Sequence, residues 1–131
     1  IEERAFENCQ SLKTVTIPYN ATHVGDWAFS GCLNLTTVST QNKIQYIGNG
    51  AFYNCEKLKS IKLSQALTYI GNNAFNGCRS LTSISIPSST QFVGAYAFLN
   101  CDNLQLTINE NAYLSNWDEN WNDGNNSCIV L

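Results

Sequence analysis

The feature that most constrains the fold is a short motif, Ala-Phe-x-(Asn or Gly)-Cys, that returns at a fixed interval. Its phenylalanines are Phe6, Phe29, Phe52, Phe75 and Phe98, and its cysteines are Cys9, Cys32, Cys55, Cys78 and Cys101, each 23 positions after the previous one. A unit of about 23 residues cannot bury its own apolar face, so copies must stack, and at least about three are needed for stability. The 131 residues hold almost five copies, which predicts a solenoid.

Residues 78–98, "CRSLTSISIPSSTQFVGAYAF", show how one repeat is built. Leu81, Ile84 and Ile86 have the spacing of a short strand with one apolar face, and the serines between them point to the other face. Pro87 then closes the strand, because proline is tolerated at a strand end but not inside a ladder. A second extended piece follows and ends at Val93. We expect the main strands of successive copies to align in parallel, about 4.8 Å apart, in one sheet along a curved solenoid.

The segment after the second extended piece predicts a tight turn. A glycine stands there in four copies, as Gly25, Gly48, Gly71 and Gly94, which indicates either a positive φ or a close approach between coils. Ala97 and Phe98 are expected to begin a helical or 3₁₀ turn. The residue before each cysteine is Asn8, Gly31, Asn54, Gly77 or Asn100, and these two residue types most readily adopt the left-handed conformation that ends such a turn.

The cysteines predict packing rather than metal binding. Five of the six occupy one repeat column, so we expect a ladder of buried free thiols that act as small hydrophobic groups. Pairwise oxidation stays an alternative if neighbouring Cα atoms lie within about 4.4 to 6.8 Å. There is no Cys-x-x-Cys pair and only one histidine, so neither a zinc site nor any other metal or cofactor is predicted.

The segments "LTSISIPSSTQFVGAYAFLNC" and "LKSIKLSQALTYIGNNAFNGC" resemble the BspA-like, or Treponema-type, leucine-rich repeat. The resemblance covers residues 1–108, with local departures such as Thr40 in place of a strand aliphatic and one residue lost from the fifth strand. It implies a right-handed, β-rich α/β horseshoe-like leucine-rich-repeat solenoid of about five repeats, the first one truncated. It also implies a cell-surface or secreted protein, since several members of this family resemble adhesins of bacteria and some protozoa.

The tail, residues 109–131, leaves the repeat and resembles the tryptophan-containing segment that often follows the last repeat in bacterial members. Tyr113, Trp117, Trp121 and the apolar end of the chain are expected to cover the final layer as a C-terminal cap, which a solenoid requires for solubility. The alternative is that the two tryptophans form an aromatic binding site.

Composition narrows the classes of partner. Charged residues make up 13% of the chain and the net charge is -3, so no binding of nucleic acid is predicted. No apolar run reaches the roughly 18 residues of a membrane span. Ile1 falls in the column of Val24, so we expect the chain to begin inside a repeat, as the C-terminal part of a longer protein.

The pattern does not predict an enzyme. His23 is the single histidine and sits in a surface column, so a Ser-His-Asp or Cys-His arrangement would have to be built on one exposed residue. The cysteines have no basic neighbour that would lower their pKa. No catalytic residues are therefore assigned.

Two surfaces are candidates for binding. The first is an outward column of aromatic residues, His23, Tyr46, Tyr69 and Phe92, which offers a rigid amphipathic stripe for proteins or sugars or else a purely structural ladder. The second is the solvent side of the main strands on the concave face, with Thr14, Thr16, Thr37, Ser39, Ser60, Lys62, Ser83 and Ser85. Its alternative interpretation is a solvated β-surface.

The repeat pattern favours a non-enzymatic interaction module, and the resemblance implies that it binds host or microbial surface proteins or glycans, in adhesion or host interaction. Because stacking makes a rigid array, affinity is expected from many weak, evenly spaced contacts. The alternatives are a structural spacer that projects another domain, and an accessory domain of a larger extracellular enzyme.

Overall fold

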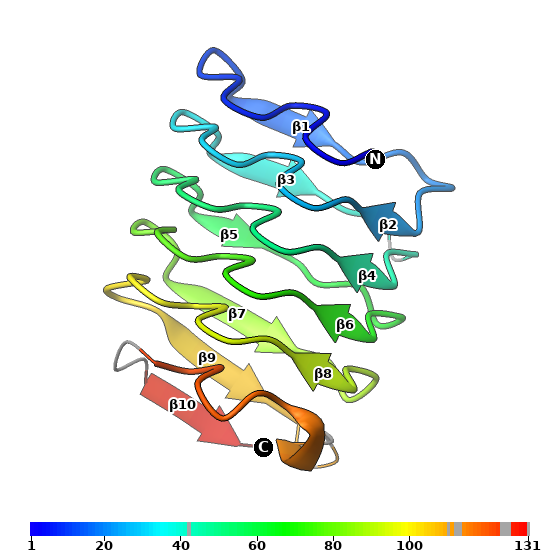
Figure 1. The fold of residues 1–131 in the computed structure, drawn as a ribbon, viewed down its shortest axis with the longest axis vertical. Helices are drawn as coiled ribbons and strands as arrows, with labels where there is room; N and C mark the ends of the chain where they lie inside the picture. Colours follow the sequence, from blue (N-terminus) through cyan, green and yellow to red (C-terminus); the bar gives the residue numbers. More distant parts are fainter. Residues whose placement is uncertain (42, 110, 112–113, 124–126, 131) are drawn as a thin grey trace.

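The computed structural model describes residues 1–41, 43–109, 111, 114–123 and 127–130, and they form a parallel-strand solenoid (Figure 1). The larger sheet, here called the main sheet, has the strand order β1 (Thr14–Thr16), β3 (Thr37–Ser39), β5 (Ser60–Ile61), β7 (Ser83–Ile86), β9 (Gln105–Ile108) and β10 (Ser127–Val130). A second sheet contains β2 (His23–Val24), β4 (Tyr46–Ile47), β6 (Tyr69–Ile70) and β8 (Phe92–Val93). The first four main strands are each followed by one strand of the second sheet, whereas β9 and β10 belong to the main sheet alone. The predicted leucine-rich-repeat solenoid is confirmed.

The main sheet follows the 23-residue step of the sequence. Thr14 pairs with Thr37, Thr37 with Ser60 and Ser60 with Ser83. These side chains are exposed, whereas the residues next to them in the strands, such as Ile61 and Ile84, are buried. The alternation of side chains along a strand thus puts hydroxyls outside and aliphatic groups inside, as predicted.

The expectation of one sheet was incomplete, because the second extended piece of each coil pairs with the equivalent piece of the next coil and forms a second sheet. Val24 is matched with Ile47, and Ile47 with Ile70, in parallel register. All three side chains are buried. The solenoid consequently has two walls of parallel strands that enclose one core.

The predicted helical turn after the glycine was wrong, and with it the α part of the α/β description. Residues 95–100 form turns, and the only helix in the described part of the chain is the 3₁₀ segment η1 (Leu114–Asn116). The reason is the direction of the hydrogen bonds. The amide of Phe52 donates to the carbonyl of Ala74 in the next coil at 2.8 Å, so it is not free to donate to the carbonyl four residues back, as an α-helix requires.

Two backbone features of the turn explain its invariant residues. An added Cβ on Gly71 would lie 2.6 Å from the carbonyl carbon of Gly48 in the preceding coil, and Gly71 has no positive φ, so close approach is the correct alternative. The predicted left-handed residues are confirmed, with φ of 55° at Asn54 and 83° at Gly77. A second left-handed position was not predicted, and even Trp27 adopts it, with φ of 58°.

The core is built around a stack of phenylalanine rings. Neighbouring rings of Phe6, Phe29, Phe52, Phe75 and Phe98 are nearly parallel, with centroids 5.2 Å to 5.6 Å apart. The four later rings are fully buried, whereas Phe6 in the first coil is 40% exposed. One aromatic ring per coil therefore links each layer to the next.

The tail contacts the last layer of this stack. The ring of Trp121 meets Phe98 edge-on, with centroids 6.4 Å apart, and Trp117 is only 7% exposed beside Trp121. The amide of Tyr96 donates to the carbonyl of Asn120 at 3.0 Å. These contacts support a cap over the final coil, while the boundary at residue 109 stays a prediction. Tyr113 lies outside the described residues.

Candidate functional site

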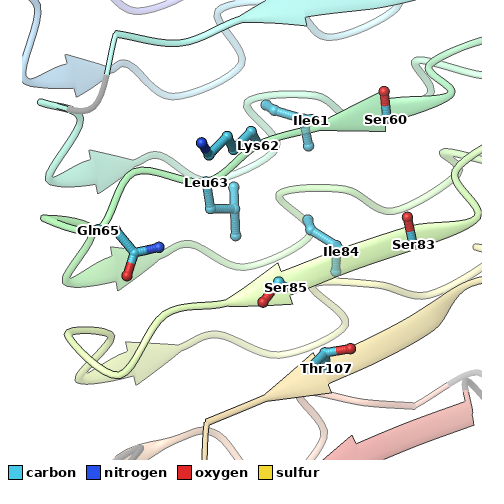
Figure 2. A pocket seen from close by; sticks show the side chains of 9 residues that line it. All are labelled: Ser60, Ile61, Lys62, Leu63, Gln65, Ser83, Ile84, Ser85 and Thr107. Carbon is cyan, nitrogen blue, oxygen red and sulfur yellow. The ribbon is translucent and has the colours of Figure 1, made fainter.

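The exposed face of the main sheet has a hollow of about 430 Å³ between β5 and β7 (Figure 2). It is lined by Ser60, Ile61, Lys62, Leu63, Gln65, Ser83, Ile84, Ser85 and Thr107. Its volume is within the range of small-molecule sites in proteins, about 300 to 1,000 Å³.

The hollow lies where two neighbouring strands part. β7 and β9 are paired over four residues, but β5 and β7 are paired only at Ser60 and Ser83. Beyond that pair, the hydroxyl of Thr40 donates to the carbonyl of Lys62 at 2.7 Å, and so ties this part of the third coil to the second. Thr40 is the polar residue that departs from the repeat pattern, and its bond fixes the carbonyl of Lys62 on the side of the second coil.

The hollow combines an apolar floor with a polar rim. Ile61, Leu63 and Ile84 are buried, while the serines, Gln65 and Lys62 are exposed. Within the described part of the chain, the ammonium group of Lys62 has no hydrogen-bond or ion-pair partner. The rim therefore presents one unpaired cation among groups that can both donate and accept hydrogen bonds.

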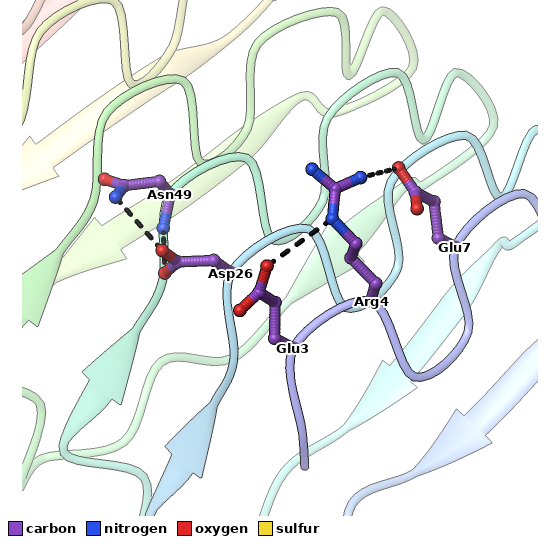
Figure 3. Close-up of polar contacts among 5 residues, drawn as sticks. All are labelled: Glu3, Arg4, Glu7, Asp26 and Asn49. Carbon is purple, nitrogen blue, oxygen red and sulfur yellow. Dashed lines mark hydrogen bonds and ion pairs between the residues drawn. The ribbon is translucent and has the colours of Figure 1, made fainter.

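The charges of the chain are divided between its faces. The main-sheet strands and the residues directly before and after them in the sequence (13–17, 36–40, 59–62, 82–87, 104–109 and 126–131) contain Lys13, Lys59 and Lys62 and no aspartate or glutamate. Carboxylates gather instead on the turns, where Glu3 and Glu7 flank Arg4 at 3.5 Å and 2.7 Å (Figure 3). In a chain of net charge -3, the main sheet is thus locally cationic.

The aromatic stripe is a stack along the second sheet. The ring centroids of Tyr46 and Tyr69 are 4.6 Å apart, those of Tyr69 and Phe92 4.9 Å, and those of His23 and Tyr46 5.5 Å. Both faces of Tyr46 and Tyr69 are therefore covered by neighbouring rings. Burial, followed by the nearby Asp26 carboxylate, raises the pKa of Tyr46. The stripe offers ring edges and hydroxyls rather than the open ring faces on which sugars stack.

A ladder of Asp and Asn side chains, which the sequence analysis did not recognise, joins the coils next to the glycines that recur in the turns. Asp26 accepts a hydrogen bond from the amide of Asn49 at 2.9 Å (Figure 3), Asn49 accepts from the amide of Asn72, and Asn72 from that of Ala95. The signal was present as a column of Asp, Asn and Asn directly after the glycines. Since each side chain satisfies a backbone donor of the next coil, the ladder is structural.

The buried cysteine thiols have low reactivity. Cys32, Cys55, Cys78 and Cys101 are buried and each donates a hydrogen bond to a phenylalanine carbonyl at 3.1 Å to 3.2 Å. Burial raises the pKa of each of these thiols, that of Cys101 to about 12. They therefore stay protonated and are poor nucleophiles. The predicted ladder of buried free thiols is confirmed for these four cysteines, whereas Cys9 in the first coil is a free thiol that is only partly buried.

Other catalytic and metal-binding arrangements are not visible in the described part of the chain. The ring of His23 forms a hydrogen bond with the hydroxyl of Thr22 at 2.7 Å, and no acidic side chain of the described residues is hydrogen-bonded to that ring. No group of three metal-ligating side chains is found among the described residues, and none of their helices is long and apolar enough to cross a membrane.

The hollow brings together half of the residues expected on the concave face. Ser60, Lys62, Ser83 and Ser85 line it, whereas Thr14, Thr16, Thr37 and Ser39 lie on β1 and β3 outside it. Sequence reasoning missed Thr107 because the fifth strand has lost one residue, so Ser85 pairs with residue 107 and not 108. Gln65 was missed because it belongs to the loop after β5, where no strand pattern applies.

Parallel coils of about 23 residues, a phenylalanine stack and a hydroxyl-rich strand face define a leucine-rich-repeat protein. A family model described as "BspA type Leucine rich repeat region (6 copies)" matches residues 1–105. The chain therefore belongs to the BspA-type leucine-rich repeat family. A search of curated proteins found no match.

Solved structures support the same assignment. The chain is similar to the T. pallidum leucine-rich repeat protein TpLRR, with 30% identity and a TM-score of 0.79 over 83% of this chain and 50% of that one. A leucine-rich cell surface protein from Faecalibacterium prausnitzii has 25% identity and a TM-score of 0.63, over 86% and 39%. The pneumococcal vaccine antigen PcpA shares the fold, with 18% identity and a TM-score of 0.70, over 99% and 39%. The chain thus spans half or less of the length of these proteins.

Proposed function

We propose that the chain is a non-enzymatic interaction module of a cell-surface or secreted protein, and that it binds surface proteins or glycans of a host or another microbe through the exposed face of the main sheet. The observation that carries the proposal is the hollow between β5 and β7, because it is a concave site with an apolar floor, hydroxyl groups and an unpaired cation. The similarity to a leucine-rich cell surface protein supports the location.

The hollow is a better site than the aromatic stripe on geometric grounds. In the stripe, stacking between coils already covers both faces of Tyr46 and Tyr69. In the hollow, exposed polar groups stand over buried aliphatic side chains, which is the usual composition of a ligand site. The stripe accordingly stabilises the second sheet, and the main sheet contacts the ligand.

The test is binding of the chain to a panel of extracellular-matrix glycoproteins and glycans by biolayer interferometry. A Ser83→Tyr variant fills the hollow, and Thr14→Tyr is its matched control, because both residues are exposed in the same strand column. A third variant replaces Tyr46, Tyr69 and Phe92 with Ser, and circular dichroism verifies that each variant is folded.

We expect Ser83→Tyr to abolish binding and Thr14→Tyr to preserve it. Loss of binding only in the aromatic variant would move the site to the stripe. Absence of binding to every probe would overturn the proposal in favour of a structural spacer or an accessory domain of a larger enzyme.

A further inference from the structure

We propose that the hollow between β5 and β7 recognises an acidic sugar unit, with Lys62 as the group that binds its anionic substituent. The inference rests on the proposed function and names the class of ligand for the same site. It follows from three properties of the main sheet: its charge, its hydrogen-bonding groups and its lack of large side chains.

The charge of the site favours an anion. Lys62 lies at the rim of the hollow, and its ammonium group has no partner within the described residues. Four other cations have a partner: Arg4 contacts two glutamates, Arg79 contacts Asp102, Lys57 donates to the amide oxygen of Asn34, and Lys43 lies 4.2 Å from the ring centroid of Tyr19. Within the described residues the side chains of Lys13, Lys59 and Lys62 have no such partner, and of these three only Lys62 lines the hollow. Lys62 is therefore a cation that the fold leaves available for a ligand.

No carboxylate of the sheet competes for this cation. The strands and the residues that flank them carry Lys13, Lys59 and Lys62 without an acidic residue, although the chain has ten aspartates and glutamates in total. Glu3, Glu7 and Asp26 lie on the turns beyond the second sheet, among the polar contacts of Figure 3. A local positive potential on an acidic protein attracts an anionic group to this face and keeps it away from the others.

The hydrogen-bonding groups favour a sugar over a peptide. Ser60, Ser83, Ser85 and Thr107 surround the hollow with hydroxyls, and Gln65 adds an amide. A hydroxyl both donates and accepts, as the hydroxyls of a sugar do, so several orientations of a pyranose find complementary partners. The floor of Ile61, Leu63 and Ile84 supplies an apolar surface for the C–H groups of the ring.

The side chains that anchor protein partners are missing from this face. Energetic centres of protein interfaces are enriched in Trp, Tyr and Arg, while Ser and Thr are under-represented there. The main-sheet strands β1, β3, β5, β7, β9 and β10 contain no aromatic residue and no arginine. Their composition is therefore that of a surface that binds through many small polar contacts to a hydroxylated ligand.

The experiment measures the affinity of the whole chain for a galacturonate oligosaccharide and for the methyl ester of the same oligosaccharide, which keeps the shape and removes the charge. A sulfated dextran and a polyglutamate peptide are further probes. Lys62→Gln removes the cation of the hollow, and Lys59→Gln removes a cation of the same strand segment that does not line it. Titrations at two salt concentrations report the electrostatic part of each affinity.

We expect the free acid to bind about tenfold to a hundredfold more tightly than its ester, as for a hydrogen bond to a charged group. Lys62→Gln should remove this preference and most of the salt dependence, and Lys59→Gln should retain the preference. Tighter binding of the sulfated dextran, lost in Lys62→Gln, would assign the anion as a sulfate and uphold the inference.

Other outcomes overturn the inference without touching the proposed function. Equal affinities for acid and ester, or an unchanged preference in Lys62→Gln, would remove the role of the cation. Tighter binding of polyglutamate than of any sugar would replace the sugar with an acidic peptide. If all the sugars fail but a protein of the panel still binds in a way that Ser83→Tyr abolishes, the ligand class is wrong and the interaction module stands.

Discussion

The phenylalanine stack gives the sharpest test of the fold, through the substitution Phe75→Ala. Phe75 is fully buried, and its two ring faces are covered by Phe52 and Phe98, with centroids 5.3 Å and 5.6 Å away. Truncation of a core phenylalanine to alanine costs about 3 to 5 kcal/mol, from lost burial and the cavity left behind. Because two stacked pairs are lost with the ring, we expect the free energy of unfolding to fall by about 4 to 5 kcal/mol.

Phe6→Ala is a matched control, since it removes the same ring from the same column. Phe6 is 40% exposed and has one stacked neighbour, Phe29. Complete burial of such a side chain is worth about 1.5 to 3 kcal/mol, so the partly exposed ring should contribute about 1 to 2 kcal/mol. The two variants should therefore differ by about 3 kcal/mol.

The assay is equilibrium unfolding in urea, followed by tryptophan fluorescence and far-ultraviolet circular dichroism. The comparison is valid if the dependence of the unfolding free energy on urea is the same for each variant. Equal losses for Phe75→Ala and Phe6→Ala, or a midpoint for Phe75→Ala close to that of the unchanged chain, would refute the stack as the core of the solenoid.

Two further predictions concern the turn and the thiols. Gly71→Ala should lower the unfolding free energy by about 1 to 3 kcal/mol, because the new methyl group would lie 2.6 Å from backbone of the preceding coil; an unchanged melting temperature would contradict this close approach. Burial raises the pKa of the Cys101 thiol from 9.0 to about 12. Below about pH 9 the thiol is protonated in both the folded and the unfolded chain, and its contribution to the free energy of unfolding is complete. As pH rises toward 12 the unfolded chain loses this proton first, so the free energy of unfolding falls by about 1.4 kcal/mol per pH unit. Urea unfolding measures how far the free energy of unfolding falls between about pH 8 and about pH 10.5. This fall should be smaller for Cys101→Ala than for the unchanged chain, and equal falls would exclude a raised pKa of Cys101.

The sequence alone determined the repeat, the core and the parallel order of the main strands. The 23-residue step placed Phe, Cys and the strand aliphatics in columns, and a repeat that cannot bury its own face has one solution, a stack. It also predicted the left-handed residue before each cysteine, since Asn and Gly are the types that tolerate a positive φ. These properties are either local or recur with the 23-residue repeat, so they can be predicted from the sequence of one repeat.

The tertiary structure decided where coils depart from one another. The turn is not helical because every second amide donates to the next coil, as Phe52 does to Ala74, while the amides between them donate within the coil, as Tyr53 does to Gly50. A sequence read one repeat at a time does not show that competition. The hollow exists because β5 leaves β7 after one pair, while Thr40 of another coil holds the carbonyl of Lys62. Thr107 enters the hollow only because the fifth strand is one residue short. A binding site on a solenoid is formed by differences between neighbouring coils, and such differences acquire a position only when the coils are stacked.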